Sequence, residues 1–271
     1  LNLTFTFGEL YGRSLVGKTI TVPTHKQVEA NKKYRVVINV LMGYMYLFSD
    51  GTTGPLAKNP GKTPVGVVVE PYRRIAVALH DAQPTYYGSN KWSISTNSDG
   101  RSATSYKDLF DYFSNNRGLV TPSYPYSNYP ATELAQNYYQ TAGYGVSGGA
   151  YGYWYVPSLD DFLLMGVSLG KLPNHTPGTR HFPNDFSYLI PTYAPATGFG
   201  ASVVFPSMDM TRFNKAFTDV GGTAPSGSYW TSNECQDGGN YMQGTMFIGA
   251  GYSFQLTSKT NTAQVRPFIR Y

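Results

Sequence analysis

Apolar and polar side chains alternate with the two-residue period of β-strands near both ends of the chain. In the first 80 residues this alternation covers 3–7, 34–40, 65–69 and 75–79, and β-branched and aromatic residues dominate it. Such stretches are typical of half-buried strands. Asp50-Gly51 indicates a turn between two of these runs. Towards the end of the chain the same pattern predicts four more strands, over 228–232, 245–248, 252–256 and 265–269.

The middle of the chain has the longer apolar period of α-helices, and four helices are predicted there. One has an apolar face made by Tyr106, Leu109, Phe110 and Phe113; a second begins at Pro130 and ends at Gly143; a third begins at Ser158, with Leu159, Phe162 and Leu163 facing inward; a short fourth contains Met210, Phe213 and Phe217. Ser158 and Asp161 have the spacing of a capping box. Strands, then helices, then strands make an α+β order rather than a parallel βαβ alternation.

Composition narrows the class of protein. With 41% hydrophobic residues among 271, the chain can bury a core and is not a disordered segment. No apolar run is long enough to span a membrane. The one cysteine, Cys235, excludes an internal disulfide framework and a cysteine-based zinc site. Only 14% of the residues are charged, whereas 24 are Tyr, and such a composition is typical of wet, adhesive surfaces.

The net charge of +5 does not indicate a nucleic-acid-binding protein. Lys and Arg are scattered, with only Lys32-Lys33 and Arg73-Arg74 adjacent, whereas a nucleic-acid footprint is clustered. The chain opens at Leu1, inside a strand-like pattern and without an initiator Met. We therefore expect a processed or truncated product, and the lack of a targeting segment says nothing about its compartment.

Three glycine-containing motifs match known sequence patterns, but the secondary structure predicted on either side of them does not fit those patterns. Residues 12–19 fit a phosphate-binding P-loop, yet they run into alternating residues and Pro23 where a P-loop needs a helix. Residues 143–148 fit a dinucleotide-binding pattern, and 145–149, with Ser147, fit a hydrolase nucleophile elbow. Both patterns require a preceding strand, and the sequence predicts a helix there. We expect a β-hairpin at the first motif and a flexible loop at the other two.

Candidate catalytic and metal-binding side chains are few. The residues that would complete a hydrolase triad are Asp160 or Asp161 and His175 or His181. The two histidines lack a third zinc ligand, and Asn184-Asp185 supplies too few oxygens for calcium. Without a nucleophile or an acid–base pair in the right context, we expect a non-catalytic protein that has no metal or other cofactor.

Three segments of the second half form a set: 154–162 (Trp-Tyr-Val-Pro-Ser-Leu-Asp-Asp-Phe), 229–234 (Tyr-Trp-Thr-Ser-Asn-Glu) and 265–270 (Val-Arg-Pro-Phe-Ile-Arg). In order and spacing they resemble the C-type-lectin-like domain of Bacteroidales surface proteins, which is related to the major paralogous domain of Fibrobacter. Residues 44–51 and 64–68 resemble the opening of that domain, so the resemblance covers 43–271. It implies an α+β, C-type-lectin-like fold with twisted antiparallel sheets and roughly two to four helices. We expect Trp154, Trp230 and Phe268 to be buried structural anchors, and Pro267 to mark an edge strand or a bulge.

The resemblance concerns the fold and not calcium-dependent sugar binding. The chain has neither the Glu-Pro-Asn or Gln-Pro-Asp loop nor the Trp-Asn-Asp strand of calcium-dependent lectins. Formylglycine-generating enzymes share the fold and, as the resemblance implies, work through two cysteines, whereas this chain has one. An enzyme of that type is therefore the lesser alternative.

Residues 1–42 resemble the final strands of a fimbrillin domain, as in pilins of the same bacteria. Two or three strands cannot close a sandwich alone, so they must pair with further chain, with the lectin-like domain or with another pilin subunit. The resemblance thus implies two domains, 1–42 and 43–271, and an extracellular location at the cell surface, on the outer membrane or in a fimbria.

Two binding functions remain open. The first is an adhesin or fimbrial-tip module for a host or bacterial surface ligand, either glycan or protein. The second is a hypervariable displayed protein of a diversity-generating retroelement, since 228–256 is rich in Asn, Tyr, Ser, Thr, Asp and Gly. For either function we expect the ligand at a loop over 233–243, held by the strand of Trp230. The candidate contacts are Asn233, Gln236, Asp237, Asn240, Tyr241 and Gln243, with the tyrosines of 124–155 as the other candidate region.

Overall fold

The chain divides into two compact units, Leu1–Gly43 and Tyr44–Tyr271. The computed structural model describes residues 2–4, 9–10, 13–14, 16–17, 19–21, 43–71, 73–82, 90–97, 102–103, 129–140, 145–146, 154–172, 202–237 and 240–271. Two predicted elements lie outside these residues, the strand over 34–40 and the helix that contains Tyr106. The candidate residues Ser147, His175, His181, Asn184 and Asp185 also lie outside them.

The smaller unit contains short antiparallel pairs of strands. β1 (Asn2–Thr4) pairs with β4 (Thr19–Thr21), and the hydroxyl oxygens of Thr4 and Thr19 lie 2.9 Å apart. β2 (Glu9–Leu10) pairs with β3 (Arg13–Ser14). Residues 19–21 are therefore strand, as predicted, where a P-loop would have a helix.

The larger unit contains a six-stranded sheet in the order β10-β15-β8-β7-β5-β6, and all of its pairs are antiparallel. Its strands are β5 (Tyr46–Phe48), β6 (Thr53–Gly54), β7 (Pro64–Glu70), β8 (Ile75–Ala78), β10 (Trp154–Tyr155) and β15 (Phe268–Arg270). β7 and β8 confirm two of the predicted strands, and Asp50-Gly51 is the predicted turn, between β5 and β6.

The strand at the C-terminal end differs from its prediction. β15 is shorter than the predicted 265–269 and lies between β10 and β8 rather than at an edge. Pro267 directly precedes it, and the Pro267 carbonyl accepts a hydrogen bond from the Ala78 N–H at 2.9 Å. The expectation that Pro267 marks an edge or a bulge is wrong, because a residue just outside a strand needs no N–H of its own.

A second sheet of five strands has the order β11-β14-β13-β12-β9. Four strands are antiparallel, and β9 pairs in parallel with β12. The strands are β9 (Ser102–Ala103), β11 (Val203–Phe205), β12 (Gly227–Asp237), β13 (Asn240–Ile248) and β14 (Tyr252–Ser258). The predicted strands over 228–232 and 245–248 are both longer than expected, and together they replace the predicted loop over 233–243.

Three α-helices are present in the described part of the chain: α2 (Pro130–Asn137), α3 (Leu159–Gly170) and α5 (Met210–Thr218). α2 has its predicted start at Pro130, but it ends before Gly143, at Asn137, and continues as the 3-10 turn η3 (Tyr138–Gln140). A second 3-10 turn, η1, spans Leu56–Lys58. α3 has the predicted capping box of Ser158 and Asp161. The fold class is therefore α+β, with helices and open antiparallel sheets.

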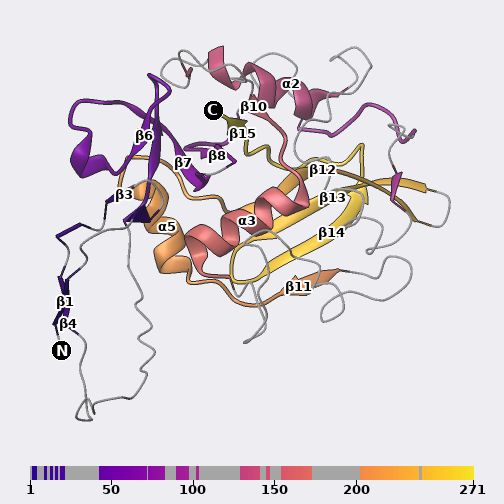
Figure 1. Ribbon diagram of the computed structural model, residues 1–271. Helices are drawn as coiled ribbons and strands as arrows, with labels where there is room; N and C mark the ends of the chain where they lie inside the picture. The colour runs from indigo at the N-terminus through magenta and orange to yellow at the C-terminus, as the bar shows by residue number, and fades with distance from the viewer. Residues whose placement is uncertain are drawn as a thin grey trace, which may run out of the picture. The chain divides into compact units, whose positions relative to one another are not determined.

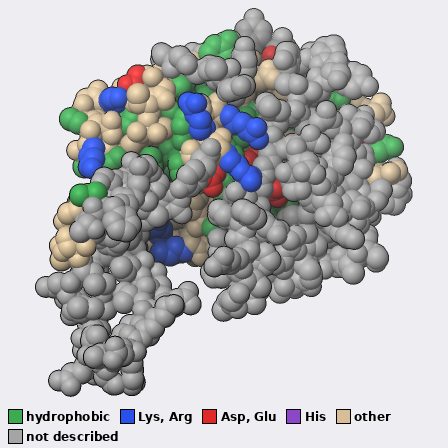
Figure 2. All heavy atoms as spheres, in the orientation of Figure 1, with side chains coloured by type: hydrophobic (Ala, Val, Ile, Leu, Met, Phe, Trp, Pro, Cys, Tyr) green, Lys and Arg blue, Asp and Glu red, His purple; other side chains and the backbone are tan. Residues whose placement is uncertain are grey.

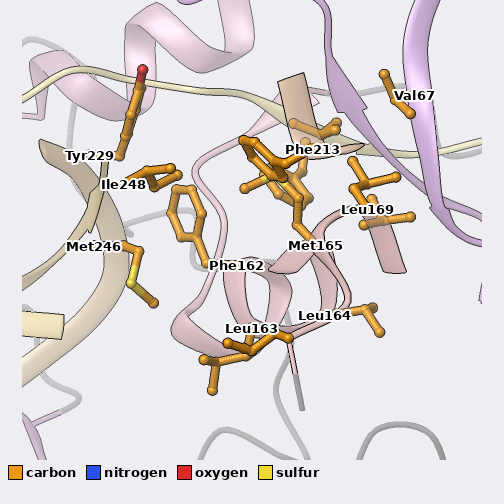
Figure 3. Packing of buried hydrophobic residues seen from close by; sticks show 14 of the residues in the cluster. Val67, Phe162, Leu163, Leu164, Met165, Leu169, Phe213, Tyr229, Met246 and Ile248 are labelled. Atoms are coloured by element: carbon orange, nitrogen blue, oxygen red, sulfur yellow. The ribbon is translucent and has the colours of Figure 1, made fainter. Parts of the chain in front are cut away.

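Two clusters of buried side chains form the core of the larger unit. In the first, Phe162 of α3 lies beside Tyr229, Met246 and Ile248 of β12 and β13, and Met165 of α3 lies nearer to Phe213 of α5 (Figure 3). Figure 1 shows α3 lying along these strands. The second cluster contains Ala131 and Ala135 of α2 and the aromatic residues Trp92, Trp154 and Trp230. Trp154, Trp230 and Phe268, the three expected anchors, have no exposed surface.

Candidate functional site

The segment expected to hold the ligand contacts is the β12–β13 hairpin. Its lower part, from Gly227 to Trp230, pairs in one register, and its upper part, from Glu234 to Asp237, pairs in another. The pairs of the upper part are Glu234–Gln243, Cys235–Met242, Gln236–Tyr241 and Asp237–Asn240. Between the two parts, residues 231–233 form a bulge in β12. The expectation of a loop over 233–243 is wrong, because this polar segment pairs along two strands.

Two of the six candidate ligand contacts point inside. Asn233 and Gln243 have no exposed surface. The Asn233 Oδ1 accepts a hydrogen bond from the Leu159 N–H, at 2.7 Å, at the beginning of α3. The Gln243 Nε2 donates to the Thr231 carbonyl at 2.7 Å. The Asn233 amide joins the hairpin to α3, the Gln243 amide joins β13 to the bulge of β12, and in this arrangement neither amide faces a ligand.

The remaining candidates lie at the tip of the hairpin. Gln236 and Tyr241 are directly opposite one another and half-buried, and Asn240 is exposed. The Asp237 backbone pairs with Asn240, and its side chain is outside the described part of the structure. Gln236 and Tyr241 therefore lie on one face of the hairpin tip, and Asn240, the residue before Tyr241, lies on the other. Amide groups and an aromatic ring can hydrogen-bond to and stack on a ligand.

An ion pair that the sequence analysis missed lies next to the bulge of the same hairpin. The Glu234 carboxylate contacts the Lys259 ammonium, and the two side chains are 2% and 0% exposed. The Lys259 Nζ also donates to the Asn97 carbonyl at 2.8 Å. This pair ties β12 to the residue after β14 and to the 90–97 segment. Glu234 ends one of the recognised sequence segments, but no pattern in the sequence distinguishes Lys259 as its partner.

Arg266 is the centre of a second buried polar cluster. Its guanidinium has no exposed surface, donates to the Ala78 and Thr223 carbonyls at 3.1 and 3.0 Å, and pairs with Asp81, with 2.7 Å between Nε and Oδ1. Burial raises the pKa of the Asp81 carboxyl, and the Arg266 charge opposes that rise. Burial also lowers the pKa of His80 next to it. Because each contact of Arg266 joins parts of the core, we assign this cluster to stability.

Among the described residues in the view of Figure 2, several Lys and Arg side chains gather near the middle, and Asp and Glu side chains lie close to some of them. Within the described ranges, no group of three or more His, Cys, Asp or Glu residues is placed to hold a metal ion. No helix there is long and apolar enough to cross a membrane. Comparison of the chain with protein-family models, curated proteins and solved structures found no match.

Proposed function

We propose that this protein is a non-catalytic, extracellular binding module of the adhesin or fimbrial-tip type, and that the tip of the β12–β13 hairpin contacts its ligand. A surface glycan or a surface protein is the proposed partner. The observation that carries the proposal is the contrast between the middle of the hairpin and its tip: the middle, around the bulge, is fixed by buried contacts, and the tip presents Gln236, Asn240 and Tyr241. Recognition groups on a rigid support lose little entropy when they bind.

The contacts between the three recognised segments support a C-type-lectin-like fold for the larger unit. Trp154 and Tyr155 pair with Ile269 and Phe268 in neighbouring strands. The Ser232 N–H donates to the Pro157 carbonyl at 2.8 Å. The three sequence segments on which the resemblance depends therefore meet in the core, as expected if they define one fold.

For the smaller unit we propose a fimbrillin-like origin and a partner among pilin subunits. The support is limited to its antiparallel strand pairs, β1 with β4 and β2 with β3. These short strands bury little surface because they are few. Pairing with additional strands would therefore stabilise them.

The experiment measures adhesion of the full chain to cultured epithelial cells and to a printed array of glycans. We expect the combined variant Gln236→Ala, Asn240→Ala and Tyr241→Ala to lose at least about tenfold in binding, since a few central contacts dominate recognition. The unfolding midpoint should stay the same, because none of the three side chains is fully buried.

A matched control removes an exposed Asn and an exposed Tyr elsewhere, with Asn214→Ala in α5 and Tyr139→Ala in η3. The control should bind as the unchanged chain does. Loss of binding in the control alone would move the ligand to the tyrosine-rich region of 124–155. Unchanged binding in both variants, with unchanged stability, would contradict a site at the hairpin. A template repeat beside the gene would favour the hypervariable displayed protein over the adhesin.

A further inference from the structure

The bulge at residues 231–233 shifts the pairing of the hairpin by two residues. From the pair Trp230–Thr245 to the pair Glu234–Gln243, β12 advances by four residues and β13 by two. Without the bulge, the lower register would continue and Glu234 would lie opposite Tyr241. A shift of two leaves every side chain on its own face of the sheet, because side chains alternate with period two. The apolar pattern of the strands therefore fits both registers.

The residues at the tip of the hairpin can form a two-residue turn in either register. In the observed register the last pair is Asp237–Asn240, which leaves Gly238 and Gly239 between the strands. In the unbulged register the last pair would be Gln236–Gly239, which leaves Asp237 and Gly238. Gly-Gly and Asp-Gly are both favoured in two-residue hairpin turns. The chemistry of the turn does not select one register.

Buried polar contacts at the bulge do favour the observed register. β13 and β14 pair in one unbroken register from Met242 onward, so a change would have to move β12 and not β13. That movement would break the hydrogen bond from the Leu159 N–H to Asn233 and the ion pair of Glu234 with Lys259. Breaking either contact leaves a buried polar group without its partner, which is costly.

We propose that the β12–β13 hairpin is a two-register element, and that Asn233 and Glu234 hold it in the bulged register. The two registers present different tips. Tyr241 lies opposite Gln236 in the bulged register, and it would lie opposite Glu234 in the other. A group that replaces Lys259 as the partner of Glu234 would thereby change the surface displayed at the tip. The inference goes beyond the proposed function, and its test needs no ligand.

Disulfide trapping reads the register directly, because Cys235 is the one cysteine of the chain. Cys235 lies opposite Met242 in the bulged register and would lie opposite Asn240 in the unbulged one. With an added thiol oxidant to accept the two electrons, Met242→Cys and Asn240→Cys each allow a single intramolecular disulfide between cross-strand neighbours, scored by intact mass as the loss of two hydrogen atoms. In the otherwise unchanged chain we expect only the Met242→Cys variant to close. Equal closure of Asn240→Cys would show that the register is not held.

Removal of the polar contacts is expected to raise the disulfide yield of the Asn240→Cys variant and to lower that of the Met242→Cys variant. In a background with Asn233→Ala, Glu234→Gln and Lys259→Met, the disulfide yield of Asn240→Cys should rise by about tenfold, since a lost buried hydrogen bond and ion pair shift an equilibrium by at least that factor. The yield of Met242→Cys should fall in the same background. Unchanged yields would overturn the proposal.

The control removes an ion pair that is exposed and remote from the hairpin, with Asp50→Asn and Lys62→Met, and it should change neither yield. Circular dichroism and thermal unfolding establish that each background folds. If the triple background does not fold, Glu234→Gln alone is used, because its amide keeps the hydrogen bond to Lys259 but removes the charge. A severalfold rise of the Asn240→Cys yield is then expected, and no rise overturns the proposal.

Discussion

At the scale of a single residue, Trp230 joins β12 to two distant segments of the chain, around Asn90 and Gln264. Its ring is fully buried, lies 6.2 Å from the Trp92 ring, and donates from Nε1 to the Asn90 carbonyl at 2.6 Å. Its backbone N–H donates to the Gln264 carbonyl at 3.0 Å. The side chain thus holds the 90–97 segment and the approach to β15 against β12. A large apolar ring with a satisfied polar atom is well suited to such a position.

Replacement of Trp230 by Ala is expected to lower the free energy of unfolding by about 3–5 kcal/mol, through lost burial and the cavity that remains. Trp230→Phe should cost less, because it keeps one aromatic ring in the core, although it loses the second ring of the indole and the hydrogen bond to the Asn90 carbonyl. Urea unfolding of the purified chain measures both. The control, Val204→Ala, removes an apolar side chain that is 56% exposed and should cost about 0.5 kcal/mol or less. A Trp230→Ala variant as stable as this control would contradict the anchoring role.

At the scale of elements, the sequence predicts those whose signals are local. The start of α3 follows from Ser158 and Asp161, which are three residues apart and cap one another. β7 follows from the run of Val65, Val67 and Val69. In such elements the partner of each polar group is nearby in the sequence, so the pattern and the structure agree.

The β12–β13 hairpin shows why other elements could not be predicted. Asn233 and Gln243 indicate a loop when only their neighbours in the sequence are considered. In the structure, the Asn233 Oδ1 accepts from the Leu159 N–H and the Gln243 Nε2 donates to the Thr231 carbonyl, so each buried amide has one of its two polar atoms paired with a distant part of the chain. Two of the six predicted ligand contacts, Asn233 and Gln243, therefore lie in the core. Lys259 was missed because its partner is distant in the sequence.

The cap of α3 gives a prediction at the same scale. Ser158 Oγ accepts from the Asp161 N–H at 3.2 Å, and the Ser158 N–H donates to the Asp161 carboxylate at 3.0 Å, both in the core. Ser158→Ala is expected to cost about 1–2 kcal/mol, at the upper end for a cap because no water can replace the hydroxyl. The exposed cap of α5, Asp209→Ala, should cost about 0.5–1 kcal/mol. Chemical denaturation compares the two, and an equal or reversed order would contradict a cap strengthened by burial.

At the scale of the whole unit, one buried arginine joins both sheets and a helix. Arg266 donates to Ala78 of β8 in the six-stranded sheet. Its guanidinium lies over the rings of Phe217, from α5, and Tyr229, from β12 of the second sheet, at 5.7 and 6.0 Å from their centres. Asp81, 19% exposed, balances its charge. The planar guanidinium can make these contacts at once, whereas a lysine ammonium cannot.

The last prediction follows from the energetics of a buried ion pair, in which removal of one partner costs more than removal of both. Arg266→Met is expected to lower the free energy of unfolding of the larger unit by about 3–5 kcal/mol, because Asp81 is left in the core without its counter-charge. The double variant Arg266→Met and Asp81→Asn should recover much of that loss, since it removes the unpaired charge and a neutral amide takes its place. Urea unfolding of the two single variants and the double variant forms a complete mutant cycle. Additive losses would show that Asp81 and Arg266 act independently, and that the arginine stabilises the unit through its carbonyl and ring contacts alone.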